Sequence, residues 1–564
     1  MLNLTRKLRL ALLWHMHQPL YRSGESNLLP WTRLHATKDY LDTARAIEEH
    51  PGIKATINLV PSLLLQLKEY ASGSVDDQVL HLTRTPAFLL TQDQKHQIAA
   101  NFFQCNVELM VLPFPRYAEL YARIGGENRV LSDEELATLN PQDWLDLQVW
   151  YLLTWIGPYA AEQNPLFGRL IEKGRGFTEG EKLRLIEGTL ALIGEIIPLW
   201  KKLYNSGQVE LSVSPFYHPI LPLLIDLKAA RESLPDEALP DAETGWVEDA
   251  SLHISGAVNY FTREFGAPPS GMWPSEGSIS QRTLELIRKE GLRWIASDET
   301  VLQNSLGEKR FPLSHAFPWK FKTEDGDLYL FFRDHDLSDR VGFIYASMDP
   351  EEAAEDFLHG LLLRRASLVR EFGEEVLEEA VLPVILDGEN CWEYYRENGR
   401  PFLEALYRKL SESELIETVT FSEVVASLEE RGTGRTLERL QAGSWIGGNF
   451  RIWIGEEEEN RAWEALAATR SVLMAERDTI SDDDFYAAYE ELLIAEGSDW
   501  FWWYGEENTT VNDPLFDRLF REHLMNVYRL IGKEPPEELN KPIRNYTGGG
   551  HGGAMHRAEL PSPS

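Results

Sequence analysis

One apolar run, Val381-Leu382-Pro383-Val384-Ile385-Leu386, followed by Asp387-Gly388-Glu389, decides the fold class that we expect for this chain. Six mostly branched apolar residues in a row predict a strand that is buried on both faces and ends at Gly388. Asp387 then lies at the carboxyl end of a buried strand, where parallel α/β folds place their catalytic groups. Asp-Gly is also a common turn dipeptide, so a purely structural aspartate is the competing interpretation.

Other apolar runs have the same form and alternate with segments of helical periodicity. They occupy 8–14, 53–60, 207–214, 294–299 and 328–333, and polar or aromatic residues follow each of them. Strands that alternate with helices and end in such residues predict a (β/α) barrel over 1–400. The stretch at about 62–205 is mostly helical and acidic, so we expect it to be a long insertion in the barrel.

The pattern changes after the barrel. From 401 to 540 nearly everything has helical periodicity, apart from two aromatic stretches at 443–453 and 496–506. We therefore expect a helical domain at 401–540 that contributes two aromatic loops to the mouth of the barrel. The Gly-rich segment with a Pro-Ser end predicts a disordered tail at 541–564.

The composition excludes several classes of partner. Lys and Arg total 55 against 90 Asp and Glu, so the formal net charge is −35, and neither nucleic acid nor an anionic membrane is expected to bind. The 17 Trp suit stacking on the flat faces of sugars. The first apolar run ends at His15 without a cleavage site, and Cys105 and Cys391 do not suggest a disulfide framework. We therefore expect a cytoplasmic protein.

His15 and His17 follow the first predicted strand and project to the same side of it. Such a pair can bind a metal, donate hydrogen bonds to a substrate, or simply end a strand. A metal site would need a third ligand from another strand end, for which Asp298 and Asp334 are the candidates.

Two glutamates also fall at informative positions. Glu210 alternates with apolar neighbours in its strand, so it faces the barrel interior and needs a partner such as a sugar hydroxyl or a histidine. Glu276 comes three residues after Trp273, in a loop between two helical segments. The alternative to a functional role is that Glu276 is simply an acidic residue in the loop before a helix, where the helix dipole favours a negative charge.

Together these residues resemble glycoside hydrolase family 57, whose retaining enzymes act on α-glucans and include α-amylases, amylopullulanases and 4-α-glucanotransferases. Five blocks carry the resemblance in the family's order: 15–19, 207–211, 273–276, 387–389 and 445–453. The resemblance implies a distorted (β/α)7 TIM-like barrel and a helical bundle that completes the cleft. The first block, His-Gln-Pro, is closer to amylases and amylopullulanases than to branching enzymes.

The resemblance also implies roles for individual residues. Glu276 matches the catalytic nucleophile and Asp387 the general acid/base, as a retaining mechanism requires. The residues that we expect to bind substrate are His15, His17, Glu210, Trp273, Trp392, Trp445, Asp298, His335 and Trp453.

Four functions compete at this point. The leading one is an α-glucan hydrolase that cleaves α-1,4 and also α-1,6 links, without a cofactor or a metal. A 4-α-glucanotransferase would share the same covalent intermediate and pass it to a sugar hydroxyl. A metal-dependent hydrolase or deacetylase would use His15 and His17. A non-catalytic glycan-binding protein would need the aromatic residues but not the paired Glu276 and Asp387.

Overall fold

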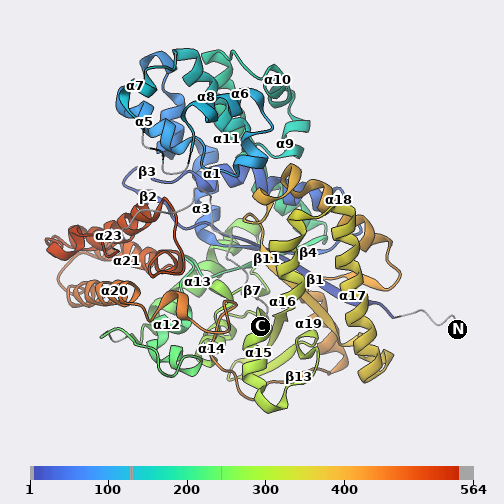
Figure 1. The fold of residues 1–564 in the computed structure, drawn as a ribbon. Helices are drawn as coiled ribbons and strands as arrows, with labels where there is room; N and C mark the ends of the chain where they lie inside the picture. Colours follow the sequence, from blue (N-terminus) through green and yellow to red (C-terminus); the bar gives the residue numbers. More distant parts are fainter. Residues whose placement is uncertain (1–5, 127–128, 130, 243, 545–564) are drawn as a thin grey trace.

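The structure, a computed structural model, describes residues 6–126, 129, 131–242 and 244–544 (Figure 1). Parallel strands at its centre lie in the order β11–β1–β4–β6–β7–β8–β10. Their bounds are β1 Leu8–Met16, β4 Ala55–Leu59, β6 Val209–Val213, β7 Gly271–Met272, β8 Trp294–Asp298, β10 Gly326–Arg333 and β11 Val381–Asp387. The Asp334 N–H donates to the Pro383 carbonyl at 2.7 Å across the gap between β10 and β11. The sheet therefore curls into the distorted seven-stranded barrel that the sequence predicts.

Side chains fill the inside of this barrel. Trp294 stacks on Phe421 with ring centroids 4.5 Å apart, and Phe331 packs edge-on against both rings. Gly271 is required beside them, because a Cβ at this position would lie 1.8 Å from the Trp294 ring. The barrel centre is thus a packed core, which leaves its carboxyl end as the place for a site.

Helices cover the outside of the barrel. They are α13 Val247–Phe265, α14 Gln281–Lys289, α15 Glu299–Leu306, α17 Pro350–Phe372 and α18 Arg400–Glu412. Helix α19, Phe421–Arg431, instead packs its buried residues into the inner cluster of the barrel. At one edge, β9 Trp319–Thr323 pairs antiparallel with β10, and β13 Arg435–Thr436 pairs with β9.

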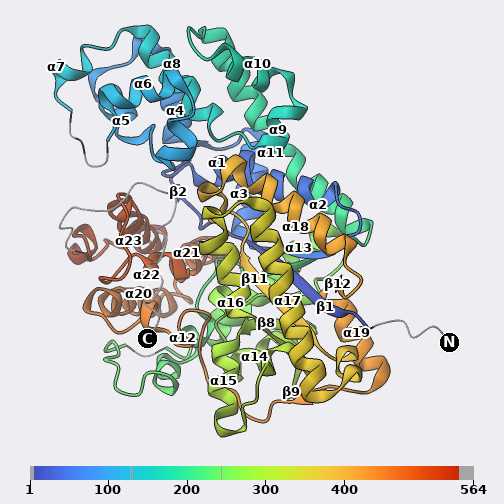
Figure 2. The ribbon, with the colours of Figure 1, turned by 45° about the vertical axis from the view of Figure 1, so that its right-hand side comes forward.

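A helical segment lies between β4 and β6, at the top of the molecule in both ribbon views (Figures 1 and 2). Its main helices are α3 Pro61–Ser72, α4 Gln78–Arg84, α5 Gln92–Asn101, α6 Pro115–Ile124, α8 Pro141–Leu153, α10 Pro165–Lys173 and α11 Glu179–Asn205. Local signals fix where they start, since Thr91, Asn140 and Thr178 form capping boxes. Trp144, Trp150 and Trp200 are buried here, so part of the tryptophan content is core.

The chain after 401 does not leave the barrel at once, contrary to the expected boundary. The short strand β12, Ile416–Thr418, pairs in parallel with β1, and Phe421 at the start of α19 enters the barrel interior. The separate helical unit begins later and comprises α20 Glu457–Ala475, α21 Asp482–Ala495, α22 Ser498–Trp502 and α23 Asp513–Leu530. It lies on the left in Figure 1.

Residues 541–544 are ordered, contrary to the prediction of a disordered tail from 541. Ile543 N–H donates to Asp517 at 3.0 Å, and the Arg544 guanidinium donates to the carbonyls of Trp503 and Asn508. The rest of that prediction, from 545 onward, lies outside the described residues. Within the described part of the chain, no helix is both long and apolar enough to span a membrane.

Candidate active site

A pocket opens at the carboxyl ends of the barrel strands, and distant segments of the chain supply its walls. The polar lining consists of His15, His17, Gln18, His35, Glu276, Asp387, Glu389, Asn390 and Asp499. The aromatic lining consists of Tyr21, Trp31, Trp445, Trp502, Trp503 and Phe516. Four carboxyl groups, several neutral polar groups and a wall of flat rings therefore face one cavity, as in many ligand sites.

The sheet register places the first part of the site. His15 on β1 is aligned with Asp387 on β11 and with Asn58 on β4. The Nδ1 atom of His15 lies 2.7 Å from Asn58 Oδ1. Asp387 ends its strand and accepts a hydrogen bond from Asn390 at 2.8 Å. The buried run that ends at Asp387 thus delivers this carboxylate to the pocket, as the sequence predicts.

Glu276 arrives on the loop after β7 in an unusual backbone conformation. Its φ is 57° and that of Gly277 is 58°, both in the left-handed region. For a non-glycine residue this conformation is strained, and it commonly occurs at functional sites. Trp445 makes two hydrogen bonds to Glu276. Its backbone N–H donates to the Glu276 carbonyl at 3.0 Å, and its indole N–H donates to Glu276 Oε2 at 2.8 Å.

Burial sets the protonation of the two carboxyl groups. It raises the pKa of Glu276 to about 8, and the charge of Asp387 adds to the rise while the Trp445 hydrogen bond opposes it. Burial raises the pKa of Asp387 as well. Because each charge disfavours the other, the pair keeps one proton in the neutral range. One acid and one carboxylate side by side are the groups needed to cleave a glycosidic bond.

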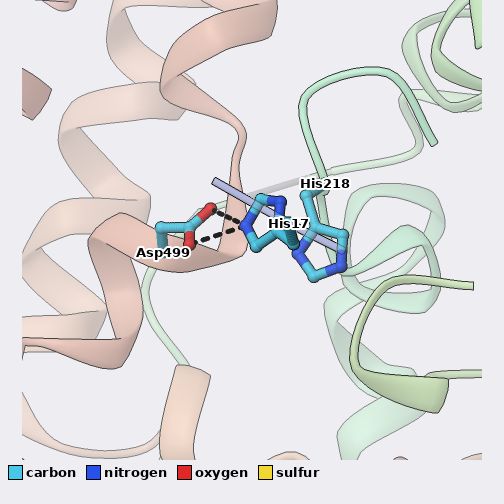
Figure 3. Close-up of side chains that lie close together, drawn as sticks. All are labelled: His17, His218 and Asp499. Atoms are coloured by element: carbon cyan, nitrogen blue, oxygen red, sulfur yellow. Dashed lines mark hydrogen bonds and ion pairs between the residues drawn. The ribbon is translucent and has the colours of Figure 1, made fainter. Parts of the chain in front are cut away.

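Three histidine rings stack beside one another at the pocket, and Figure 3 shows two of them, His17 and His218, with Asp499. The rings of His17 and His218 stack with centroids 3.9 Å apart, and His15 lies 5.2 Å from His218. Burial lowers the pKa of His15 to about 3 and lowers that of His218, so both rings are neutral. Asp499 approaches His17 from the helical unit, with its two oxygens 2.8 and 3.0 Å from His17 Nε2.

These groups do not form a good metal site. The ligand atoms of His17, His218 and Asp499 lie within 4.8 Å of one another. However, the two rings are stacked with their planes only 24° apart, so their in-plane lone pairs do not converge on one point (Figure 3). The expected third ligands lie elsewhere: Asp298 is 3.2 Å from Arg333, and Asp334 pairs with His315 and Arg364. The residue set of the metal-dependent alternative is therefore not assembled.

Of the four tryptophans that we expected to bind substrate, the structure places one in the pocket lining and three in the core. Trp445 lines the pocket with His15 and His17, whereas Trp273 lies buried beneath it, edge-on to Trp445 at 5.2 Å. Trp392 is a core residue that donates to the Gly388 carbonyl at 2.9 Å and packs on Trp14. Trp453 is fully buried behind Trp502, with ring centroids 6.0 Å apart.

Glu210 is not in the pocket. It is the second residue of β6, and its carboxylate closes the opposite end of the barrel, where it accepts hydrogen bonds from Trp294 Nε1 at 2.9 Å and from Ser422. The alternation of the strand correctly predicted that Glu210 faces the barrel interior. It did not predict at which end of the barrel the side chain lies. Asp298 and His335 form another structural pair, 3.1 Å apart, and Asp298 also caps α15 through Thr300 N–H at 2.8 Å.

Several residues in or beside the pocket were not assigned from the sequence. His218 in the loop after β6 and Asp499 in α22 meet His17 from distant parts of the chain. Trp31 and His35 come from the short helix α1, Trp31–His35. Glu389 follows Asp387 and accepts His17 N–H at 3.0 Å and Tyr40 O–H at 3.1 Å. The only local signals were the clustering of Tyr217-His218 after a strand and of Asp499 in an aromatic stretch.

The sequence of this chain matches a known protein family. The model described as Glycosyl hydrolase family 57 matches residues 11–438. This chain belongs to that family. The match covers the barrel, the insertion and both carboxylates of the pocket, so the chain is a member of a glycoside-active enzyme family.

Individual relatives are distant. An α-amylase of Pyrococcus abyssi is 23% identical over 240 residues, which is 42% of this chain and 30% of that protein. This chain therefore matches about a third of the length of that curated relative. A branching enzyme from Pyrococcus horikoshii has a TM-score of 0.60 at 16% identity, with 94% of this chain and 93% of that chain covered. The α-amylase AmyC from Thermotoga maritima has a TM-score of 0.56 at 15% identity, covering 94% and 95%. These likenesses show the shared fold.

Proposed function

We propose that this chain is a retaining glycoside hydrolase that acts on α-glucans, with Glu276 as the nucleophile and Asp387 as the general acid/base. The observation that carries the proposal is that the two carboxyl groups share one buried pocket, where Asp387 raises the pKa of Glu276. A retaining mechanism needs its two carboxyl groups about 5 Å apart, a distance at which one charge perturbs the other.

In the free pocket the raised pKa of Glu276 favours the proton on that group, so in this proposal the proton passes from Glu276 to Asp387 as substrate binds. Asp387 donates it to the glycosidic oxygen as the bond to the anomeric carbon breaks, and the Glu276 carboxylate forms the covalent bond to that carbon. Asp387 then takes a proton from water, whose oxygen displaces Glu276 and restores the α configuration. The indole N–H of Trp445 keeps Glu276 Oε2 in place through both steps.

The remaining pocket residues suit sugar binding. Trp445, Trp502, Trp503 and Trp31 offer flat faces for stacking, and His15, His17 and Asp499 offer polar groups for sugar hydroxyls. We propose no metal in this mechanism. Dialysis against a chelator should leave turnover unchanged, and a loss that added zinc restores would contradict this.

A second candidate is a 4-α-glucanotransferase. The aromatic wall of Trp502, Trp503 and Phe516 favours it, because an acceptor sugar stacked there would compete with water for the covalent intermediate. A branching reaction, named for the Pyrococcus horikoshii structure, would differ in the hydroxyl that attacks.

Product analysis on maltooligosaccharides, amylose and pullulan separates these activities. Shorter chains with rising reducing ends mean hydrolysis, and cleavage of pullulan extends it to α-1,6 links. Redistributed lengths at constant reducing ends mean 4-α transfer, and new debranching-sensitive links at constant reducing ends mean branching. No change in any glucan would contradict the proposal.

A further inference from the structure

A buried polar contact behind the pocket connects the barrel with the helical unit. His253 on α13 and Glu496 at the end of α21 are both fully buried, and His253 Nε2 lies 2.9 Å from Glu496 Oε2. On its other side, His253 Nδ1 accepts the Tyr217 N–H at 3.4 Å. His253 therefore joins the loop after β6 to the end of α21.

The hydrogen positions in this contact follow from its partners. Nδ1 of His253 accepts a backbone N–H, so the ring proton is on Nε2 and is donated to Glu496. Burial lowers the pKa of His253 to about 3, in keeping with a neutral ring. Burial and the nearby charge of Asp249 raise the pKa of Glu496, which keeps that group protonated. The contact is thus a hydrogen bond between two neutral groups.

Glu496 directly precedes the turn that brings Asp499 to the pocket. Gly497 pairs with Pro219, Ser498 N–H donates to the His218 carbonyl at 2.9 Å, and Ser498 Oγ lies 3.1 Å from His218 Nδ1. A Cβ at Gly497 would lie 2.8 Å from the Tyr217 carbonyl oxygen, so the two loops are in close contact. The next residue, Asp499, contacts His17 on β1.

We propose that Glu496 is a positioning residue for the active site. Through His253 it holds the 497–499 turn against the loop after β6, so that Asp499 reaches His17 while His218 stays stacked on the same ring. The inference rests on the proposed function, because its effect is measured as turnover of an α-glucan. A purely structural role would give the same contacts, and the experiment must separate the two.

A double-mutant cycle of Glu496→Ala and Asp499→Asn, assayed on maltooligosaccharides, makes this separation. If Glu496 acts through Asp499, each single variant lowers kcat/KM roughly 10- to 100-fold, since a misplaced group of about 1 Å has effects of that size. In the Asp499→Asn background, Glu496→Ala should then add less than about twofold. Glu496→Gln should recover most of the activity, because its amide oxygen still accepts the His253 proton.

Glu490 provides the matched control. It lies on α21 and accepts the Tyr217 hydroxyl at 2.8 Å, so it ties the same helix to the same loop without contacting the 497–499 turn. Glu490→Ala should keep kcat/KM within about twofold of wild type. If Glu496→Ala does not fold, Glu496→Asp, which shortens the side chain by one methylene, replaces it with the same expected non-additivity.

Two results would overturn the inference: unchanged kcat/KM in folded Glu496→Ala, or a loss that multiplies fully with that of Asp499→Asn. The proposed function fails differently, because then Asp387→Ala retains turnover or the wild type turns over no α-glucan. If Asp387→Ala is inactive and the losses of Glu496→Ala and Asp499→Asn multiply fully, the positioning role of Glu496 is rejected while the proposed function stands.

Discussion

The two ends of the barrel each hold a buried glutamate that accepts an indole N–H. Glu210 at the amino end accepts from Trp294 at 2.9 Å, and Glu276 at the carboxyl end accepts from Trp445 at 2.8 Å. Burial is the main cause that raises the pKa of each carboxyl group. The two glutamates differ in what else surrounds them.

Both carboxylate oxygens of Glu210 accept hydrogen bonds, three in all with the one from Trp294. Ser422 donates to Glu210 from both its hydroxyl, at 2.5 Å, and its backbone N–H, at 2.9 Å. Glu276 instead has Asp387 as a charged neighbour and lines the pocket with a 15% exposed side chain. Under the proposed function, burial does not distinguish Glu276 from Glu210; fewer hydrogen-bond donors and a second carboxylate in the same pocket do.

The largest expected effect separates the two glutamates by activity. Glu276→Ala and Asp387→Ala should each lower kcat at least about 1,000-fold on a glucan, whereas Glu210→Gln should remain active. With an activated α-glucosyl donor and azide, Glu276→Ala should give the β-glucosyl azide, because azide enters the space of the lost nucleophile. Asp387→Ala should still form the covalent intermediate and give the α-azide. Product stereochemistry by NMR checks this, and the same azide from both variants would reverse or reject the assignment.

The second effect separates them by stability. Glu210→Ala leaves the Trp294 and Ser422 donors without their acceptor in a dry core, so unfolding should become easier by about 2–4 kcal/mol. Chemical denaturation measures the change, and kcat of the folded variant should stay within about twofold of wild type. A large loss of kcat with unchanged stability would place Glu210 in the catalytic machinery after all.

The third effect uses the two indoles as a matched pair. Trp445→Phe removes a hydrogen bond that lowers the pKa of Glu276, so that pKa should rise and the acid limb of the kcat/KM profile should move to higher pH. We expect a loss in kcat/KM of about tenfold. Trp294→Phe should leave the pH profile in place and reduce stability by about 1–2 kcal/mol. Equal pH profiles for both variants would contradict the comparison.

The fourth effect is a pH dependence of stability. Folding raises the pKa of Glu276 from 4.5 to about 8, so the folded state binds this proton more tightly than the unfolded chain. The resulting stability is fully present below pH 4.5 and is lost as the pH rises toward 8. Glu276→Gln lacks this proton, so its melting temperature relative to wild type should increase across that interval. A difference that stays constant with pH would mean that Glu276 titrates normally.

The sequence predicted much of the fold because the barrel strands are long apolar runs. It missed β7, which has two residues, and β12, which has three, since neither is long enough to show a period. Helical periodicity around β12 also moved the expected domain boundary to 401, although Phe421 still packs inside the barrel.

The site was predicted where a strand ends and was missed where the fold joins distant loops. Asp387 and His15 follow from their strands, but a strand has two buried ends, and alternation did not place Glu210 at the correct one. Trp392 lies five residues after Asp387 in the sequence and yet packs into the core. No local pattern connects Asp499 with His17, because the barrel and the helical unit bring them together only after folding.

The separation of His17 from Asp499 also has a consequence during synthesis. His17 emerges from the ribosome 482 residues before its partner, which takes roughly half a minute to a minute and a half at ordinary translation rates. Glu276 is translated about midway through that interval and Asp387 after it, while Asp499 and the rings of Trp502 and Trp503 are still absent. The pocket is therefore complete only when the last helices have been translated and docked, so chains that end between Asp387 and Asp499 carry Glu276 and Asp387 without a finished pocket.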